Sequence, residues 1–196
     1  MPLSGLNPEH RCLYNLNRLA VVRQLQYSKK NTNEIDLAIF VNGLPVVTVE
    51  LKNTLTGQTH HEAIKQYMTS RPVEGEKLLE FKRCLVHFAV GTEQVFMTTH
   101  LAGDKTHFFP FNQCFENRGI ESVSGYRTSY LWEDVLSKDS LLDLIQNYIN
   151  IQITEEKEYD EKTRKLVTKK NEALIFPRYH QRRAVKKLVA HAKING

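Results

Sequence analysis

The stretch IDLAIFVNGLPVVTVELKN, residues 35–53, contains two apolar runs separated by Asn42-Gly43. Val, Ile and Phe fill both runs, and Asn-Gly between such runs is the strongest short-range signal for a β-hairpin. Side chains alternate between the two faces of a strand, so Glu50 and Lys52 share one face of the second run, about 7 Å apart at ~3.4 Å per residue. The stretch therefore predicts a hairpin with an acid and a base on one face.

Asp36, on the first run, joins these charges only if the turn has the right geometry. A two-residue loop pairs Asp36 with Val49 and puts it on the face opposite to Glu50. A three-residue loop or an added bulge changes the parity and brings Asp36, Glu50 and Lys52 to one face. Both alternatives remain open. On one face, the three groups form an oxygen-rich cation site suited to Mg²⁺ and a phosphodiester. Otherwise, Glu-x-Lys is an ion pair on a solvated sheet.

The composition describes a globular chain with a basic balance. Its 196 residues, 41% of them hydrophobic, can bury a core, and the net charge of +5 favours an anionic partner such as nucleic acid. Cys12, Cys84 and Cys114 lack CxxC spacing, which fits a reducing cytoplasm. No apolar run approaches the ~18 residues of a membrane span, and no signal peptide opens the chain. We expect a cytoplasmic protein without a membrane partner.

The flanking segments predict an α/β (α+β) fold, a central mixed β-sheet flanked by helices. Residues 19–27 are consistent with an edge strand or a short helix and favour the strand. Residues 84–92 and 94–99 have the near-continuous apolar character of central strands. Between them, residues 60–71 have an apolar stripe at helical spacing, which predicts an amphipathic helix packed on the sheet.

The second half of the chain predicts one more helix and two appended segments. Residues 139–149 have the stripe of a core helix, so we place the main domain at residues 1–150. Acidic and then basic residues crowd residues 151–172, a pattern typical of a mobile, charged linker. Residues 173–196 predict a basic amphipathic helix. Deletion of both appended segments is expected to leave a folded domain.

Several motifs resemble known families. Asp36, Glu50-Leu51-Lys52 and the following helix resemble the PD-(D/E)xK nuclease superfamily. The segments FVNGLPVVTVELKN, FKRCLVHFAV, VFMTTHLAG, FFPFN, YLWEDVL and FPRYHQRRAVKKLV are together similar to the restriction (R) subunit of type I restriction-modification enzymes. This resemblance extends from about Asn17 to the C-terminus and implies a restriction-endonuclease-like core with a C-terminal helical extension.

The resemblance also implies a catalytic site. In the family, residues matching Asp36 and Glu50 hold Mg²⁺, and the residue matching Lys52 positions or activates the attacking water. Many members have a QxxxY motif on the next helix. Gln66 matches its glutamine, but the fourth residue after it is serine instead of tyrosine. The neighbouring Arg71 is a candidate for part of the tyrosine's role.

The C-terminal helix resembles the entry to an ATP-driven motor. Tyr179 and Gln181 are similar to the adenine-contacting Q motif of superfamily 2 helicases, whereas no GxxxxGK[ST] loop occurs in the chain. The resemblance thus implies ATP binding only in a longer protein. It also implies double-stranded DNA, modification (M) and specificity (S) subunits and the chain's own C-terminal motor domains as partners.

The resulting interpretation is a type I site-specific deoxyribonuclease that needs Mg²⁺, with the possibility that these 196 residues do not cut alone. Two alternatives remain open. One is a non-cleaving DNA-binding or motor-coupling module with a nuclease fold. The other is a related nuclease of recombination or repair, against which the motor-like terminal helix argues.

Overall fold

A mixed β-sheet forms the centre of the protein. The computed structural model describes residues 7–119, 125–160 and 165–195. In these residues the main sheet has six strands, in the order β1 (Leu19–Gln26), β2 (Glu34–Val41), β3 (Leu44–Leu51), β4 (Val86–Val90), β5 (Val95–Thr98) and β6 (Phe109–Pro110). The strands β3 and β4 are parallel, and the other neighbours are antiparallel. The predicted α/β (α+β) class with a mixed sheet is confirmed.

The strands β2 and β3 form the predicted hairpin. Asn42 and Gly43 make a two-residue turn with φ angles of 53° and 83°, the positive values that a type I′ turn requires. The register then shifts between Ile39 and Phe40, where Val46 is an extra residue on β3. The hairpin thus combines a tight turn with a β-bulge, which is one of the two ways of changing the strand parity.

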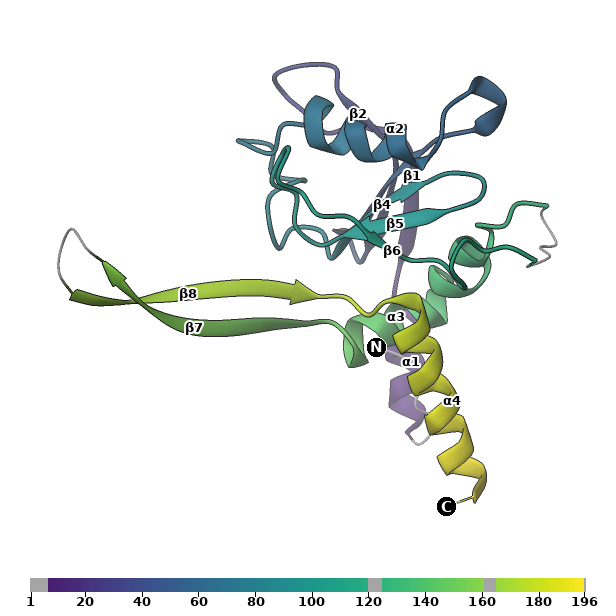
Figure 1. Cartoon of the computed structure of the whole chain (residues 1–196). Helices are drawn as coiled ribbons and strands as arrows, with labels where there is room; N and C mark the ends of the chain where they lie inside the picture. The colour runs from purple at the N-terminus through teal and green to yellow at the C-terminus, as the bar shows by residue number, and fades with distance from the viewer. Residues whose placement is uncertain (1–6, 120–124, 161–164, 196) are drawn as a thin grey trace.

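Helices cover both faces of the sheet (Figure 1). On one side lie α2 (His60–Lys65) and the π-helical turn η2 (Gln66–Ser70), and on the other lie η3 (Leu131–Val135), α3 (Lys138–Asn147) and α4 (Tyr179–Asn195). The short elements are α1 (Pro8–Asn15) and η1 (Thr54–Thr56). The side chain of Thr59 accepts a hydrogen bond from the backbone of α2, and Glu62 bonds back to Thr59. This capping box fixes the start of the predicted helix.

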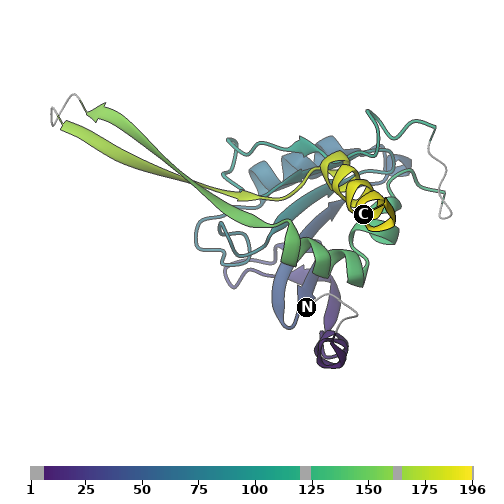
Figure 2. The ribbon, with the colours of Figure 1, turned by 90° about the horizontal axis from the view of Figure 1, so that it is seen from below.

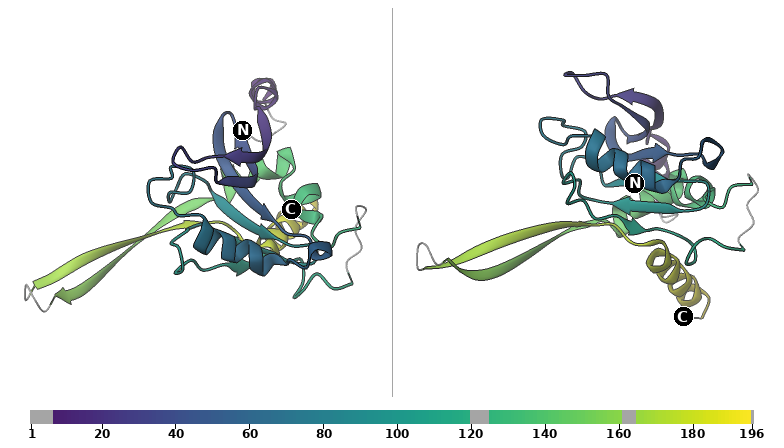
Figure 3. Two further views of the ribbon diagram at one scale, coloured as in Figure 1. Left: turned by 90° about the horizontal axis from the view of Figure 1, so that it is seen from above. Right: turned by 45° about the horizontal axis from the view of Figure 1, so that its top comes forward.

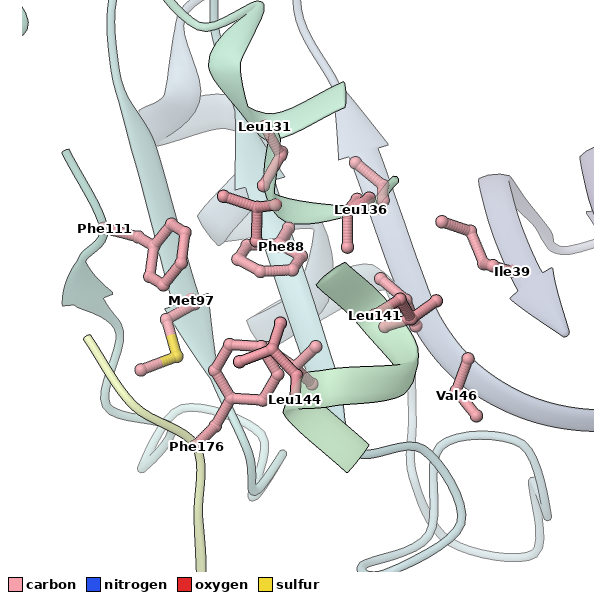
Figure 4. Packing of buried hydrophobic residues seen from close by; sticks show 14 of the residues in the cluster. Ile39, Val46, Phe88, Met97, Phe111, Leu131, Leu136, Leu141, Leu144 and Phe176 are labelled. Atoms are coloured by element: carbon pink, nitrogen blue, oxygen red, sulfur yellow. The ribbon is translucent and has the colours of Figure 1, made fainter. Parts of the chain in front are cut away.

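The main core lies between the sheet and the helices η3, α3 and α4. Phe88 is its central aromatic residue, with its ring centroid 5.2 Å from that of Phe111 and 6.0 Å from that of Phe176. Figure 4 shows these rings packed beside leucines of α3. Val47 and Val49 of β3 belong to this core. The alternate residues of β3 therefore face α2 and η2.

The expected charged linker, residues 151–172, is largely strand. Residues 150–160 (β7) and 165–175 (β8) pair along their whole length in an antiparallel ribbon, while residues 161–164 lie outside the description. The ribbon projects far from the sheet in every view (Figures 1, 2 and 3). Opposite charges face each other across it, as in the 2.9 Å ion pair between Lys170 and Glu155.

The C-terminal segment, expected to be an appendage, contributes to the main core. Phe176 and Tyr179 are buried in it, and Arg182 is almost completely buried. The Arg182 guanidinium donates to both carboxylate oxygens of Asp134, at 2.9 and 3.1 Å. Beyond this anchor α4 projects into solvent, where Leu188 is exposed. The first two turns of α4 thus belong to the folded unit, which places the end of the core well beyond residue 150.

Candidate functional site

The bulge in the hairpin brings Asp36 and Glu50 together. Leu37 pairs with Val49 in the shifted register, so the residues on either side of that pair, Asp36 and Glu50, lie opposite each other with side chains on one face. Asp36 is further fixed because its Oδ2 accepts a 2.7 Å hydrogen bond from the backbone N–H of Leu51. The geometric prediction that the two carboxylates converge is confirmed.

Glu50 is fully buried, and one of its oxygens lacks a donor. Its Oε2 has no hydrogen-bond partner among the described residues. Burial, reinforced by the neighbouring Asp36 carboxylate, raises the pKa of Glu50 from 4.5 to about 8. A buried acceptor without a donor is costly in a folded protein. The carboxylate pair therefore needs either a proton or a cation.

Arg71 is the cation that contacts this pair. It follows η2 directly, is buried, and donates from Nε to Glu50 Oε1 at 3.0 Å. The guanidinium opposes the rise in the pKa of Glu50 without cancelling it. Arg71 was predicted only as a candidate for part of the role of the motif tyrosine. In the structure it lies at the centre of the site.

Lys52 lies just beyond the end of β3. Its backbone N–H donates to Val90 O at 2.8 Å, which ties this residue to the parallel neighbour β4. The side chain is half-buried and forms no ion pair with Asp36 or Glu50 within 4.0 Å among the described residues. Its ammonium group is therefore not committed to either carboxylate.

Gln66 is less closely attached than the motif implied. It begins η2, is half-buried, and has no hydrogen bond to Glu50 or Lys52 in the described part of the chain. Its role in the site stays a prediction. The next residue, Tyr67, instead points inward and is completely buried.

Tyr67 belongs to a buried polar cluster next to the carboxylates. Its hydroxyl lies 2.9 Å from the hydroxyl of Thr48, which in turn lies 2.6 Å from Nδ1 of His87. Burial lowers the pKa of His87 to about 3 and raises that of Tyr67 well above 10.0, so both are neutral near pH 7. The cluster connects Tyr67 of η2 to Thr48 of β3. Thr48 lies two residues before Glu50, on the same face of the strand. The sequence signal that could have revealed it was Thr48, a polar residue inside an apolar strand.

The two helicase-like residues occupy different environments. The ring of Tyr179 packs against Phe111 and Tyr130, and its hydroxyl accepts a 3.0 Å hydrogen bond from Gln113. Gln181 is exposed, and its side-chain oxygen accepts from the backbone N–H of Arg178 at 2.9 Å. Adenine contact by either residue stays a prediction.

The donor set fits a hard divalent cation. Among the described residues no group of three His, Cys, Asp or Glu side chains converges. Mg²⁺, however, is commonly held by one or two carboxylates together with water and substrate phosphate oxygens. Asp36 and Glu50 supply two such carboxylates, and Glu50 Oε2 is a buried oxygen without a donor.

Comparison with known proteins identifies the family. Residues 7–106 match the family described as "Type I restriction enzyme R protein N terminus". Over 163 residues the chain is 31% identical to a Methanocaldococcus jannaschii protein named "Putative type I restriction enzyme MjaVIIIP endonuclease subunit". The match covers 81% of this chain and 14% of that relative. No solved structure matches.

Within the described residues, no helix is long and apolar enough to cross a membrane.

The family match covers both strands of the hairpin, the bulge, Arg71 and the strands β4 and β5. The chain therefore belongs to the family of N-terminal regions of type I restriction enzyme R proteins.

Proposed function

We propose that this chain is the Mg²⁺-dependent endonuclease module of a type I restriction enzyme and that it hydrolyses DNA phosphodiester bonds. The observation that carries the proposal is the buried Glu50 Oε2, which has no hydrogen-bond donor within the described residues and lies beside the carboxylate of Asp36. A purely structural carboxylate at this depth would be expected to have each oxygen hydrogen-bonded. A buried carboxylate oxygen without a donor, next to a second carboxylate, is typical of a cation site.

In this proposal Asp36 and Glu50 hold the cation. Bound Mg²⁺ supplies a positive charge that stabilises the phosphoryl oxygens in the transition state and lowers the pKa of the attacking water. The hydrogen bond from Leu51 N–H to Asp36 keeps that carboxylate in one orientation before substrate arrives. Holding the ligands in place in advance reduces the reorganisation needed during the reaction.

Lys52 and Arg71 have different roles in this proposal. Lys52 follows the end of β3, two residues after Glu50, and among the described residues its ammonium group forms no ion pair with either carboxylate, so in this proposal it orients the attacking water beside the phosphate. Arg71 holds Glu50 through Oε1 and leaves Oε2 for the cation. It also offsets the negative charge of the carboxylate pair when no cation is bound.

The partners follow from the family rather than from the site. We infer that double-stranded DNA, M and S subunits and an ATP-driven motor in the same polypeptide act with this module. The chain spans only 14% of the Methanocaldococcus jannaschii relative, and that protein is named as an endonuclease subunit. The basic net charge of +5 agrees with a polyanionic substrate.

The test is cleavage of supercoiled plasmid by the full-length R protein assembled with its partner subunits, in the presence of ATP and Mg²⁺. Asp36→Asn, Glu50→Gln and Lys52→Ala should each abolish cleavage and leave ATP hydrolysis intact. Glu34→Gln is the matched control, because Glu34 is an exposed acid two residues before Asp36 on the same face of β2. Cleavage at the wild-type rate by Glu50→Gln would overturn the proposal and favour a non-cleaving coupling module.

A further inference from the structure

A cavity of about 390 Å³ lies where the parallel strands β3 and β4 end. We call it the strand-end cavity. Its wall consists of Leu37, Leu51, Lys52, Asn53, Val90, Gly91, Thr92, Tyr126, Thr128, Ser129 and Trp132. Ligands of open α/β sheets bind outside the carboxyl ends of the strands, which is the position of this cavity.

The strand-end cavity adjoins the carboxylate site through the backbone of β3. Leu51 contributes to the cavity wall, and its N–H donates to Asp36 Oδ2 at 2.7 Å. Lys52 is also part of the wall, and it follows Glu50 by two residues. Leu37 and Leu51 alternate with Asp36 and Glu50, so the cavity and the carboxylates lie on opposite sides of the same strand ends.

The chemistry of the wall suits a flat, partly polar ring. Trp132 and Tyr126 are 36% and 50% exposed, which is unusual for large aromatic side chains in a concave surface. Leu51 adds apolar surface, and Lys52 adds a cation at the edge. Mostly apolar and aromatic walls with a few polar groups are characteristic of small-ligand sites, and 390 Å³ lies within their usual range.

Two hydroxyl groups of the wall are already engaged with the protein backbone. Thr128 Oγ1 donates to Gly91 O at 3.0 Å, and Ser129 Oγ donates to Tyr126 O at 2.9 Å. These groups are poorly placed to read the edge of a bound ring. Stacking on aromatic faces, by contrast, is tolerant of base identity.

We propose that the strand-end cavity receives one unstacked nucleobase of the DNA strand whose phosphodiester lies at Asp36 and Glu50, and that it does so without regard to base identity. The inference rests on the proposed nuclease function and extends it. Stacking on Trp132 and Tyr126 supplies the binding, and Lys52 links the base site to the phosphate site. The base acts as a handle that positions the phosphodiester next to the carboxylates.

Trp132 provides a direct test because it is the only tryptophan in the chain. The chain is titrated with a short single-stranded oligonucleotide, with Ca²⁺ in place of Mg²⁺, while tryptophan fluorescence is recorded. A second oligonucleotide of equal length carries abasic residues in its central positions and keeps every phosphate. The base-containing strand should quench Trp132, and the abasic strand should not. Equal quenching by both strands would overturn the proposal.

Two substitutions test the same contact by fluorescence anisotropy of labelled strands. Trp132→Leu and Tyr126→Ala should each weaken binding of the base-containing strand by between about 5-fold and about 150-fold, and should leave the abasic strand unchanged. Trp132→Phe should restore most of the affinity. Tyr126→Ala removes a half-exposed ring, so a folding defect in Trp132→Leu would not prevent the test. Unchanged affinity in the folded variants would refute the base site.

Failure of this inference and failure of the proposed function can be told apart. Asp36→Asn should lose plasmid cleavage and keep the base-dependent quenching of Trp132. If the wild-type enzyme does not cleave but the quenching depends on bases, the nuclease proposal falls and the base site stands. If cleavage requires Asp36 but quenching ignores the bases, the base site falls alone.

Discussion

Replacing Glu50 by glutamine should stabilise the cation-free protein, and the gain should increase with pH. Glutamine has nearly the shape of a protonated glutamate. Its oxygen can still accept the hydrogen bond from Arg71 Nε, and its amide N–H can donate to the Asp36 carboxylate. The substitution therefore makes permanent the protonated form that burial favours in Glu50.

The size of the effect follows from the pKa of about 8 in the folded state, against the ordinary value of 4.5. A pKa that rises on folding stabilises the protein below the unfolded value, and this contribution is lost as the pH rises through the folded value. Between pH 5 and pH 7 the unfolded carboxyl group is ionised while the folded one keeps its proton. The wild-type protein thus loses about 1.36 kcal/mol per pH unit from this group, or ~2.5 kcal/mol over the interval.

The assay is denaturant unfolding of the wild-type protein and of Glu50→Gln in EDTA at pH 5, 6, 7 and 8. The difference between the two proteins isolates Glu50, because every other titrating group is shared. The glutamine variant should gain ~2.5 kcal/mol relative to wild type between pH 5 and pH 7, or a melting temperature about 5–10 °C higher. Glu34→Gln should show no such trend. A stability difference that does not change with pH would refute the assigned ionisation of Glu50.

Three further outcomes follow from the structure. Mg²⁺ should raise the melting temperature of the wild-type protein but not that of Asp36→Asn. The apparent affinity of the wild-type protein for Mg²⁺ should be about 100-fold lower at pH 6 than well above pH 8, because a proton competes with the cation for Glu50. At pH 9, above the folded-state pKa of Glu50, Arg71→Met should destabilise the protein by about 3–5 kcal/mol in denaturant unfolding, because it leaves a buried carboxylate without its cation. Combination with Glu50→Gln should recover most of this loss. Phe176→Ala should lower the free energy of unfolding by about 3–5 kcal/mol in the same assay. Leu188→Ser, on the exposed part of α4, should change it by less than about 0.5 kcal/mol. Similar values for the two variants would contradict the assignment of Phe176 to the core.

Local signals predicted the hairpin well because its determinants are neighbours in the sequence. Asn42-Gly43 specifies a turn by backbone conformation alone, and the apolar runs beside it specify strands. The bulge at Val46 had to be left open, because no residue type is required at a bulge of this kind and the site depends on a single extra residue. The convergence of Asp36 with Glu50 therefore needed the three-dimensional register.

The C-terminal half was harder to predict because its stabilising contacts are distant in the chain. Charge density suggested a linker in the segment that forms the ribbon, although Glu155 faces Lys170 across the strands and offsets its charge. Residues 173–196 were predicted as a basic amphipathic helix, but Arg182 of this helix is buried and pairs with Asp134, which lies 48 residues earlier. Periodicity cannot identify a buried ion pair whose members come from different helices.

The acidic residues of the candidate site were predicted from the sequence, but the residues that surround them were not. Asp36, Glu50 and Lys52 were recognisable from alternation and from their resemblance to a nuclease motif. Tyr67 lies in the helix predicted over residues 60–71 from its apolar stripe, and the helical spacing did not indicate its hydrogen bond to Thr48. Arg71 was named as a secondary candidate, whereas it forms the ion pair with Glu50. Whether such contacts form depends on the directions in which side chains leave two different elements, and residue spacing alone does not give these directions.

Binding of Mn²⁺ measures the central claim most directly. Mn²⁺ takes oxygen ligands as Mg²⁺ does, and its electron paramagnetic resonance signal distinguishes free from bound ion. At pH 8 the wild-type chain and Glu34→Gln should each bind Mn²⁺, and both Asp36→Asn and Glu50→Gln should lose that site. If the two site variants bind Mn²⁺ as tightly as the wild-type protein, Asp36 and Glu50 do not form the cation site.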